Sequence, residues 1–183
     1  MDTPLTPLEQ FDIALDKQDA LLKILRADLH DFLDIESDSQ SWRRNYIRVS
    51  ASFIEGYIHS LKELCTMSFQ YTPPTKISSK ENKALHNEKG LDATERVKLT
   101  LRAAYKLYEL QPVPDFYGPE WERAHRVINQ RNLIIHPKGP DDLDIPDHLW
   151  SELDDGITWI ITQLCNFNSA LVNKYGSEGK EEL

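Results

Sequence analysis

Apolar residues recur at spacings of three and four along most of this 183-residue chain, and this periodicity constrains the fold more than any other feature. Five segments show it, at about 6–35, 39–69, 92–110, 119–135 and 146–175. Polar residues fill the opposite face of each segment, as in an amphipathic helix. Only 7 glycines are present, and glycine weakens helix interiors. We therefore predict an all-α fold, an antiparallel bundle of about five main helices.

Capping residues and prolines mark the ends of these segments. Thr6 followed by Pro7 has the pattern of a helix start, with proline in the first turn. Asp92 followed by Glu95 is an N-cap signature for the third segment. Pro137 directly follows the fourth segment and disfavours its continuation.

The chain has the size and composition of one globular domain. With 40% apolar and 28% charged residues, it is long enough to bury a core. Residues 1–176 are expected to form this domain, and 177–183 a charged, disordered tail. The polar residues 72–91 are expected to connect two helices, with at most a short helix around 81–88.

The sequence also limits the compartment and the cofactors. No stretch approaches the ~20 apolar residues that span a bilayer, and the first residues lack the basic start and apolar run of a secretory signal. We therefore expect a cytoplasmic protein without membrane contact. Cys65 and Cys165 fall within apolar helical patterns, which predicts two buried, reduced thiols. No Cys or His spacing resembles a zinc site and no phosphate loop is visible, so no metal or cofactor is expected.

The hexapeptide 131–136, Arg-Asn-Leu-Ile-Ile-His, carries the clearest chemical signal. On a helical wheel Asn132 falls inside the apolar stripe, flanked by Arg131 and His136, which lie about 140° apart. A buried amide without partners costs roughly 1–3 kcal/mol, so we expect Asn132 to bond to His136, four residues on, or to a neighbouring helix. Arg131 offers a permanent charge and a fork of donors for phosphate. His136 can accept and donate a proton near neutral pH.

This pattern resembles the signature of HEPN domains, in which Arg, four further residues and His end a helix and Asn directly follows the Arg. Arg131, Asn132 and His136 match it position by position, and the all-helical layout is similar too. The resemblance implies metal-independent RNA cleavage, in which the ribose 2′-OH attacks the adjacent phosphorus and leaves a cyclic phosphate and a 5′-OH. His136 would be the general acid or base, Arg131 would stabilise phosphate charge, and Asn132 would orient His136 or the phosphate. It also implies a homodimer whose two motifs line one cleft.

A second polar stripe lies on the segment 39–69. It comprises Arg44, Arg48, Ser52, Glu55, His59 and Lys62, which fall within one sector of the helix. Such stripes are usually solvated faces, and we favour that interpretation for Arg44 and Lys62. Alternatively the stripe faces the motif helix, so that Glu55 orients Arg131 and Arg48 contacts phosphate. The HEPN resemblance implies polar or acidic residues there, and we take Glu55, Arg48 and Lys138 as supporting or RNA-binding candidates.

Three hypotheses of function remain open. The first is an endoribonuclease of toxin or defence type acting on cellular RNA, with a cognate antitoxin or regulatory protein among the partners to test. The second is a non-catalytic HEPN-like module that binds a nucleotide, an RNA or a protein. The net charge of −9 supports the second, because bulk negative charge repels phosphate. The third is a structural helical dimer, with Arg131 paired to Glu120 or Asp141 and His136 capping a helix carbonyl.

Overall fold

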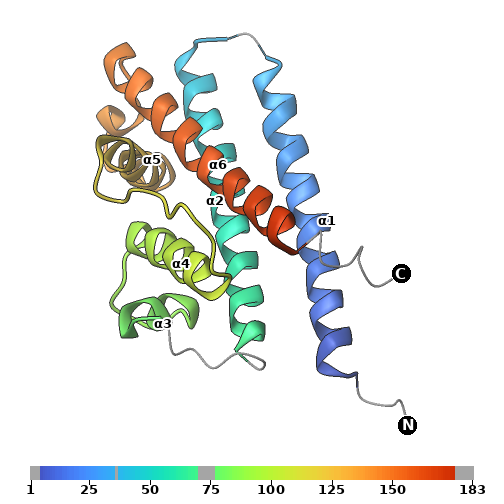
Figure 1. Ribbon diagram of the computed structural model, residues 1–183. Coiled ribbons are helices and arrows are strands. Elements are labelled where there is room, and N and C mark those ends of the chain that lie inside the picture. Colours follow the sequence, from blue (N-terminus) through green and yellow to red (C-terminus); the bar gives the residue numbers. More distant parts are fainter. Residues whose placement is uncertain (1–4, 36, 70–76, 176–183) are drawn as a thin grey trace.

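The computed structural model describes residues 5–35, 37–69 and 77–175, which form six α-helices, one 3-10 helix and no strand (Figure 1). They are α1 (Pro7–Leu33), α2 (Gln40–Ser68), α3 (Ser79–Leu85), α4 (Ala93–Leu107), α5 (Pro119–Ile135), the 3-10 helix η1 (Pro140–Leu143) and α6 (Asp147–Tyr175). The described part is therefore all-helical, as the periodicity predicts. The tail expected at 177–183 and the first residues of the 72–91 connection lie outside it. Within it, no helix is both long and apolar enough to cross a membrane.

Local capping signals set the helix starts. Before α1, the Thr6 hydroxyl accepts from the Glu9 backbone N–H, and the Glu9 carboxylate accepts from the Thr6 N–H at 2.7 Å. Before α4, Asp92 accepts from the Glu95 N–H at 2.8 Å. Ser78 starts α3 with the same reciprocal arrangement as Thr6. Each side-chain cap contributes about 1 kcal/mol, so short-range chemistry accounts for these boundaries.

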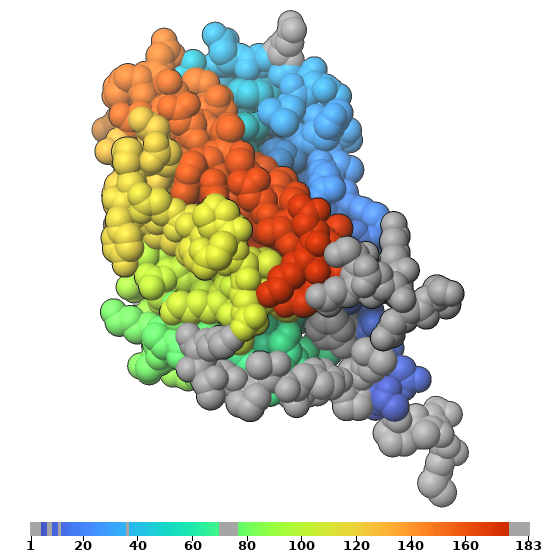
Figure 2. Space-filling model, viewed as in Figure 1, coloured from blue at the N-terminus to red at the C-terminus, as the bar shows by residue number. Residues whose placement is uncertain are grey.

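The central helix is α2, which contacts each of the other five α-helices. In Figure 1, α1 runs alongside α2 and α6 crosses it, and the space-filling view shows α6 covering α2 on the same face (Figure 2). The most deeply buried large hydrophobic side chains come from α2, α4, α6 and the segment before α6: Ile47, Ile54, Tyr57, Leu61, Leu101, Ile145, Leu153, Ile157, Ile160, Leu164 and Phe167. Each such side chain contributes roughly 1.5–3 kcal/mol when it leaves water, so α2 is fixed on several sides.

The helices α5 and α6 form a close antiparallel pair. Surface ion pairs from Arg126 to Glu152 and from Arg123 to Asp155 follow this antiparallel order. A Cβ atom at Gly156 would lie 2.6 Å from the backbone carbonyl of Arg123, nearer than real Cβ atoms approach. Glycine at this position therefore allows α6 to pack directly on the α5 backbone.

Aromatic side chains cluster at both ends of this pair. Near the start of α5, the ring of Trp121 lies 6.1 Å from that of Trp159, and Phe116 packs on both. Near the start of α6, Trp150 meets Trp42 of α2 at 5.5 Å. Edge contacts of this kind add about 0.5–1.5 kcal/mol beyond the area they bury. The first cluster therefore holds α5 to α6, and the second holds the start of α6 to α2.

Two sequence predictions about burial are wrong. Cys165 is exposed rather than buried, although Cys65 is buried as predicted. The wheel also misplaces the inward face of α5, because Asn132 and Ile135 are exposed while Val127 and Ile134 are buried. The physical reason is that α5 packs against both α2 and α6. The face of α5 that is buried is therefore wider than the apolar stripe of the helical wheel and is rotated relative to it.

Candidate functional site

The hexapeptide 131–136 forms the last turn of α5 and its C-cap. Ile134 is buried, with 2% of its surface exposed, and anchors this turn in the core. Leu133 and Ile135 are 38% and 41% exposed, and Asn132 and His136 are exposed as well. The turn is therefore held by one core residue and presents two apolar and two polar side chains outward.

The Arg131 guanidinium is fixed by two acceptors. Its Nη2 donates to Oε2 of Glu55 on α2 at 2.9 Å, and its Nη1 donates to Oδ1 of Asn132 at 3.1 Å. Glu55 therefore faces Arg131, as one of the two interpretations of the α2 stripe predicts. Among the described residues, Arg131 forms no ion pair with Glu120 or Asp141, the alternative partners. The side-chain amide of Asn132 bonds to Arg131 rather than to the His136 imidazole, which corrects the expected partner. Both side chains of the ion pair remain partly exposed, at 26% and 49%, so the charges are accessible.

Two arginines of α2 reach the segment where α5 ends. Arg48 donates to the carbonyl of Ile134 at 3.4 Å and to Oδ1 of Asn45 at 2.9 Å. Arg44 donates to the carbonyl of Leu143 at 2.8 Å and is half-buried, so it does not belong to a solvated face as predicted. The last carbonyls of a helix lack intrahelical partners and carry partial negative charge. Arg48 therefore complements the end of α5, and Arg44 complements the end of η1.

The backbone of His136, not its imidazole, caps the helix. Its N–H donates to the carbonyl of Asn132 at 3.0 Å, and the exposed side chain is directed away from the core. Lys138 is also exposed, and its backbone N–H donates to Oδ2 of Asp142 at 2.7 Å. The imidazole and the Lys138 ammonium are thus on the surface that follows α5, beside an acidic loop.

A small cavity lies beside Arg131 but does not reach His136. It measures about 30 Å³ and is lined by residues of α2, α4 and α5: Ala51, Ile54, Glu55, Ala93, Val97, Ile128 and Arg131. This volume is far below the roughly 300–1,000 Å³ of small-molecule sites and is too small for a nucleotide. Within one chain, therefore, this cavity does not bring the guanidinium and the imidazole together.

Leu133 and Ile135 are the residues of this site that the sequence does not single out. Apolar residues in an amphipathic helix are expected to be buried, so the pattern alone gives no reason to set them apart. The available signal was their position in the last turn, where fewer neighbouring elements cover the helix. Within the described residues, no group of three or more His, Cys, Asp or Glu side chains is arranged to hold a metal ion.

Comparison with known proteins finds no matching family model, no similar curated protein and no similar solved structure. The function is therefore inferred from the residues and contacts described above.

Proposed function

We propose that this chain is a HEPN-like antiparallel bundle and a metal-independent endoribonuclease, whose active site forms where the ends of α5 from two copies meet. The observation that carries the proposal is the fixed guanidinium of Arg131, held at 2.9 Å by Glu55 and at 3.1 Å by Asn132, on the same turn as the exposed His136. A guanidinium with a set orientation is suited to a phosphate group, because its fork of donors matches two phosphate oxygens.

Each residue has a defined task in this reaction. The ribose 2′-oxygen forms a bond to the adjacent phosphorus while the bond from phosphorus to the 5′-oxygen breaks. One imidazole removes the 2′-OH proton, and a second one, from the partner copy, delivers a proton to the leaving 5′-oxygen. Arg131 donates to the non-bridging oxygens, where charge develops. Glu55 and Asn132 are positioning residues, because they contact the guanidinium rather than the reacting atoms.

The proposal requires a second copy of the chain. In one protomer, the cavity beside Arg131 is too small for RNA and excludes His136. Exposed Leu133 and Ile135 lie within the same turn as both functional groups. A two-fold axis places the same patch of both copies face to face, so burial of these apolar side chains would bring two guanidinium and two imidazole groups to one cleft.

The ion pair between Arg131 and Glu55 also favours a second candidate, a non-catalytic module that binds a nucleotide, an RNA or a protein. The carboxylate already neutralises the guanidinium, so an incoming phosphate must share its donors. The net charge of −9 acts in the same direction. In this case the chain binds its ligand at the end of α5 and leaves it intact.

Cleavage of a fluorescent single-stranded RNA in the presence of EDTA distinguishes the two. We expect wild-type protein to yield fragments ending in a cyclic phosphate, and His136→Ala to lose about 10²–10⁴-fold in rate. Arg131→Ala should lose a comparable factor. The matched controls are Arg126→Ala and His125→Ala, which remove the same side-chain types from the same helix outside the hexapeptide. Circular dichroism verifies that each variant is folded.

The outcomes separate the hypotheses. RNA binding without cleavage by the wild type would replace the nuclease by the binding module. Equal loss in the controls and in the motif variants would show that α5 acts through folding alone. Light scattering tests the pairing: Leu133→Asp together with Ile135→Asp should convert a dimer to a monomer and abolish cleavage. Full cleavage by that monomer would refute the shared cleft.

A further inference from the structure

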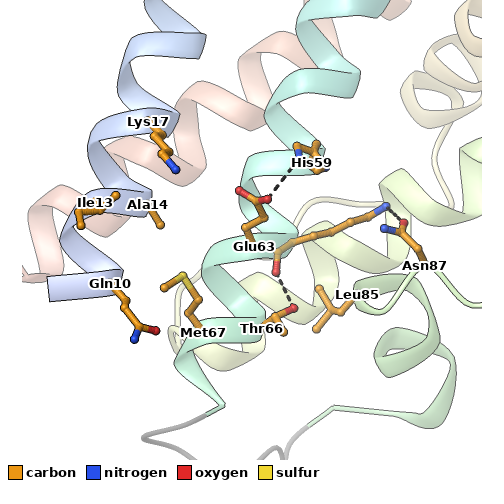
Figure 3. Close-up of a pocket in the computed structure, with 11 residues that line it drawn as sticks. Gln10, Ile13, Ala14, Lys17, His59, Glu63, Thr66, Met67, Leu85 and Asn87 are labelled. Atoms are coloured by element: carbon orange, nitrogen blue, oxygen red, sulfur yellow. Dashed lines mark hydrogen bonds and ion pairs between the residues drawn. The ribbon is translucent and has the colours of Figure 1, made fainter. Parts of the chain in front are cut away.

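A cavity of about 500 Å³ opens between α1, α2 and the turn that follows α3 (Figure 3). We call it the Lys62 cavity. It is lined by Gln10, Ile13, Ala14, Lys17, His59, Lys62, Glu63, Thr66, Met67, Leu85 and Asn87. Figure 3 shows the α1 residues on one side of α2 and Leu85 and Asn87 on the other. Its volume lies in the range of small-molecule sites, about 300–1,000 Å³. It is separate from the end of α5, since Lys62 follows Glu55 by seven residues, or about 10 Å of helix.

Lys62 is buried in the wall of this cavity, which corrects its expected place on a solvated face. Only 9% of its surface is exposed, and its ammonium donates to the neutral Oδ1 of Asn87 at 2.8 Å. No carboxylate of the described residues pairs with it within 4 Å, and the charge that acts on it most is the guanidinium of Arg96. Burial and this like charge both lower the pKa of Lys62. Charged groups this far from water normally have an opposite charge beside them.

Arg96, like Lys62, is a cation that donates only to neutral acceptors among the described residues. Its Nη2 donates to the carbonyl of Glu88 at 2.8 Å and its Nε to that of Leu91 at 3.2 Å. Its Nη1 is buried and has no hydrogen-bond partner among the described residues. Two neighbouring cations thus have only neutral acceptors.

Asn87 holds an unusual backbone conformation beside Lys62. Its φ is +54°, in the left-handed region that asparagine tolerates better than most residues. This turn, together with the Lys62 bond, sets an amide at the edge of the cavity. Amides donate as well as accept, so Asn87 can bond through its nitrogen to an anion placed on the ammonium.

The remaining walls combine further charge with apolar surface. Lys17 of α1 adds a second ammonium, and the one carboxylate in the lining, Glu63, pairs with His59 at 3.4 Å. The apolar part of the lining is Ile13, Ala14, Met67 and Leu85. In a chain of net charge −9, this lining holds two ammonium groups against one carboxylate and is therefore locally positive.

We propose that the Lys62 cavity binds a small organic anion, whose carboxylate or phosphate group pairs with the Lys62 ammonium and whose apolar part packs on Met67 and Leu85. The anion supplies the counter-charge that Lys62 lacks within the described residues, beside the further positive charge of Arg96. The proposal does not depend on RNA cleavage, because the two sites share no lining residue.

The test is a fluorescence titration of the full chain with 8-anilinonaphthalene-1-sulfonate, an organic anion with an apolar body. We expect saturable binding that is at least tenfold weaker in Lys62→Met, which keeps the side chain's length and removes its charge. The matched control is Lys23→Met, because Lys23 is exposed on α1 and pairs with Asp19. Ala14→Trp fills the cavity without altering Lys62 and should weaken the binding equally. Circular dichroism verifies that each variant is folded.

Competition then assigns the chemistry of the ligand. Displacement of the probe by octanoate supports a carboxylate, and displacement by adenosine monophosphate supports a phosphate. The proposal is overturned if the probe binds wild type and Lys62→Met equally, if Ala14→Trp leaves its affinity unchanged, or if neither competitor displaces it at millimolar concentration.

Discussion

Replacement of Gly156 by alanine tests whether direct backbone packing of α6 holds α5 in place. Alanine alone should stabilise the interior of α6 by about 1 kcal/mol relative to glycine. Its Cβ, however, would lie 2.6 Å from the carbonyl of Arg123 and 2.8 Å from the backbone nitrogen of Ala124. Backbone atoms cannot rotate away as a side chain does, so the helices must separate. Overpacking costs about 1–3 kcal/mol, and a clash with backbone belongs to the upper part of that range. Less the gain of about 1 kcal/mol in helix propensity, we expect Gly156→Ala to lower the free energy of unfolding by about 1–2 kcal/mol.

The chain offers a matched control for this change. A Cβ at Gly56 of α2 would lie even nearer to an atom, 2.4 Å from Cδ1 of Leu25, but that atom ends a flexible side chain. Leu25 can change rotamer, so the gain in helix propensity should offset most of the cost, and we expect Gly56→Ala to stay within about 0.5 kcal/mol of the wild type.

Urea denaturation followed by circular dichroism measures both variants. For a chain of this size, a loss of 1 kcal/mol also lowers the midpoint of thermal unfolding by about 2–4 °C. The reasoning is refuted if Gly156→Ala is as stable as the wild type, or if Gly56→Ala is the less stable of the two.

The remaining predictions concern stability, measured by urea denaturation. Burial raises the pKa of Glu81, but hydrogen bonds from Lys106 and Ser78 outweigh this and lower it overall. The charged carboxylate therefore stabilises the fold at pH values above its ordinary pKa, and this stabilisation is lost as the pH falls through the lowered pKa. Glu81→Gln should thus be most destabilising at pH 7 and least in acid; a pH-independent difference would contradict this. Asp92→Ala should cost about 1 kcal/mol through the lost N-cap, whereas Asp92→Ser should retain most of it. Tyr57→Phe should cost about 1 kcal/mol, because the buried hydroxyl bonds to α6; no loss would mean that those acceptors are satisfied otherwise.

Helix positions were predictable from the sequence because they depend on local patterns. Thr6 and Asp92 form the caps that their neighbours indicate. The polar stripe placed Glu55 on one face of α2, but only the HEPN resemblance suggested that this face meets Arg131, with which Glu55 forms an ion pair. Spacing along one helix determines which residues share a face, so a prediction that needs only a shared face has a sound physical basis.

The positions of Asn132 and Lys62 were not predictable in this way. A wheel gives angles within one helix, but it does not say how many neighbours pack on that helix or from which side. Asn132 is exposed because α5 turns a different arc toward α2 and α6. Lys62 is buried and bonds to Asn87, which belongs to a stretch of the chain that is polar and has no clear periodicity. Both misplacements arise from long-range packing rather than from local preference.

The two aromatic clusters make the ends of the α5 and α6 pair separately observable. Tryptophan emission responds to its surroundings, and the chain's four tryptophans divide evenly between the two ends. With Trp121 and Trp159 changed to phenylalanine, the remaining signal would come from Trp42 and Trp150, near the loop that follows the hexapeptide. With the opposite pair changed, it would report the far end. One spectroscopic readout can therefore follow events at the hexapeptide while the other end of the same helices serves as an internal reference.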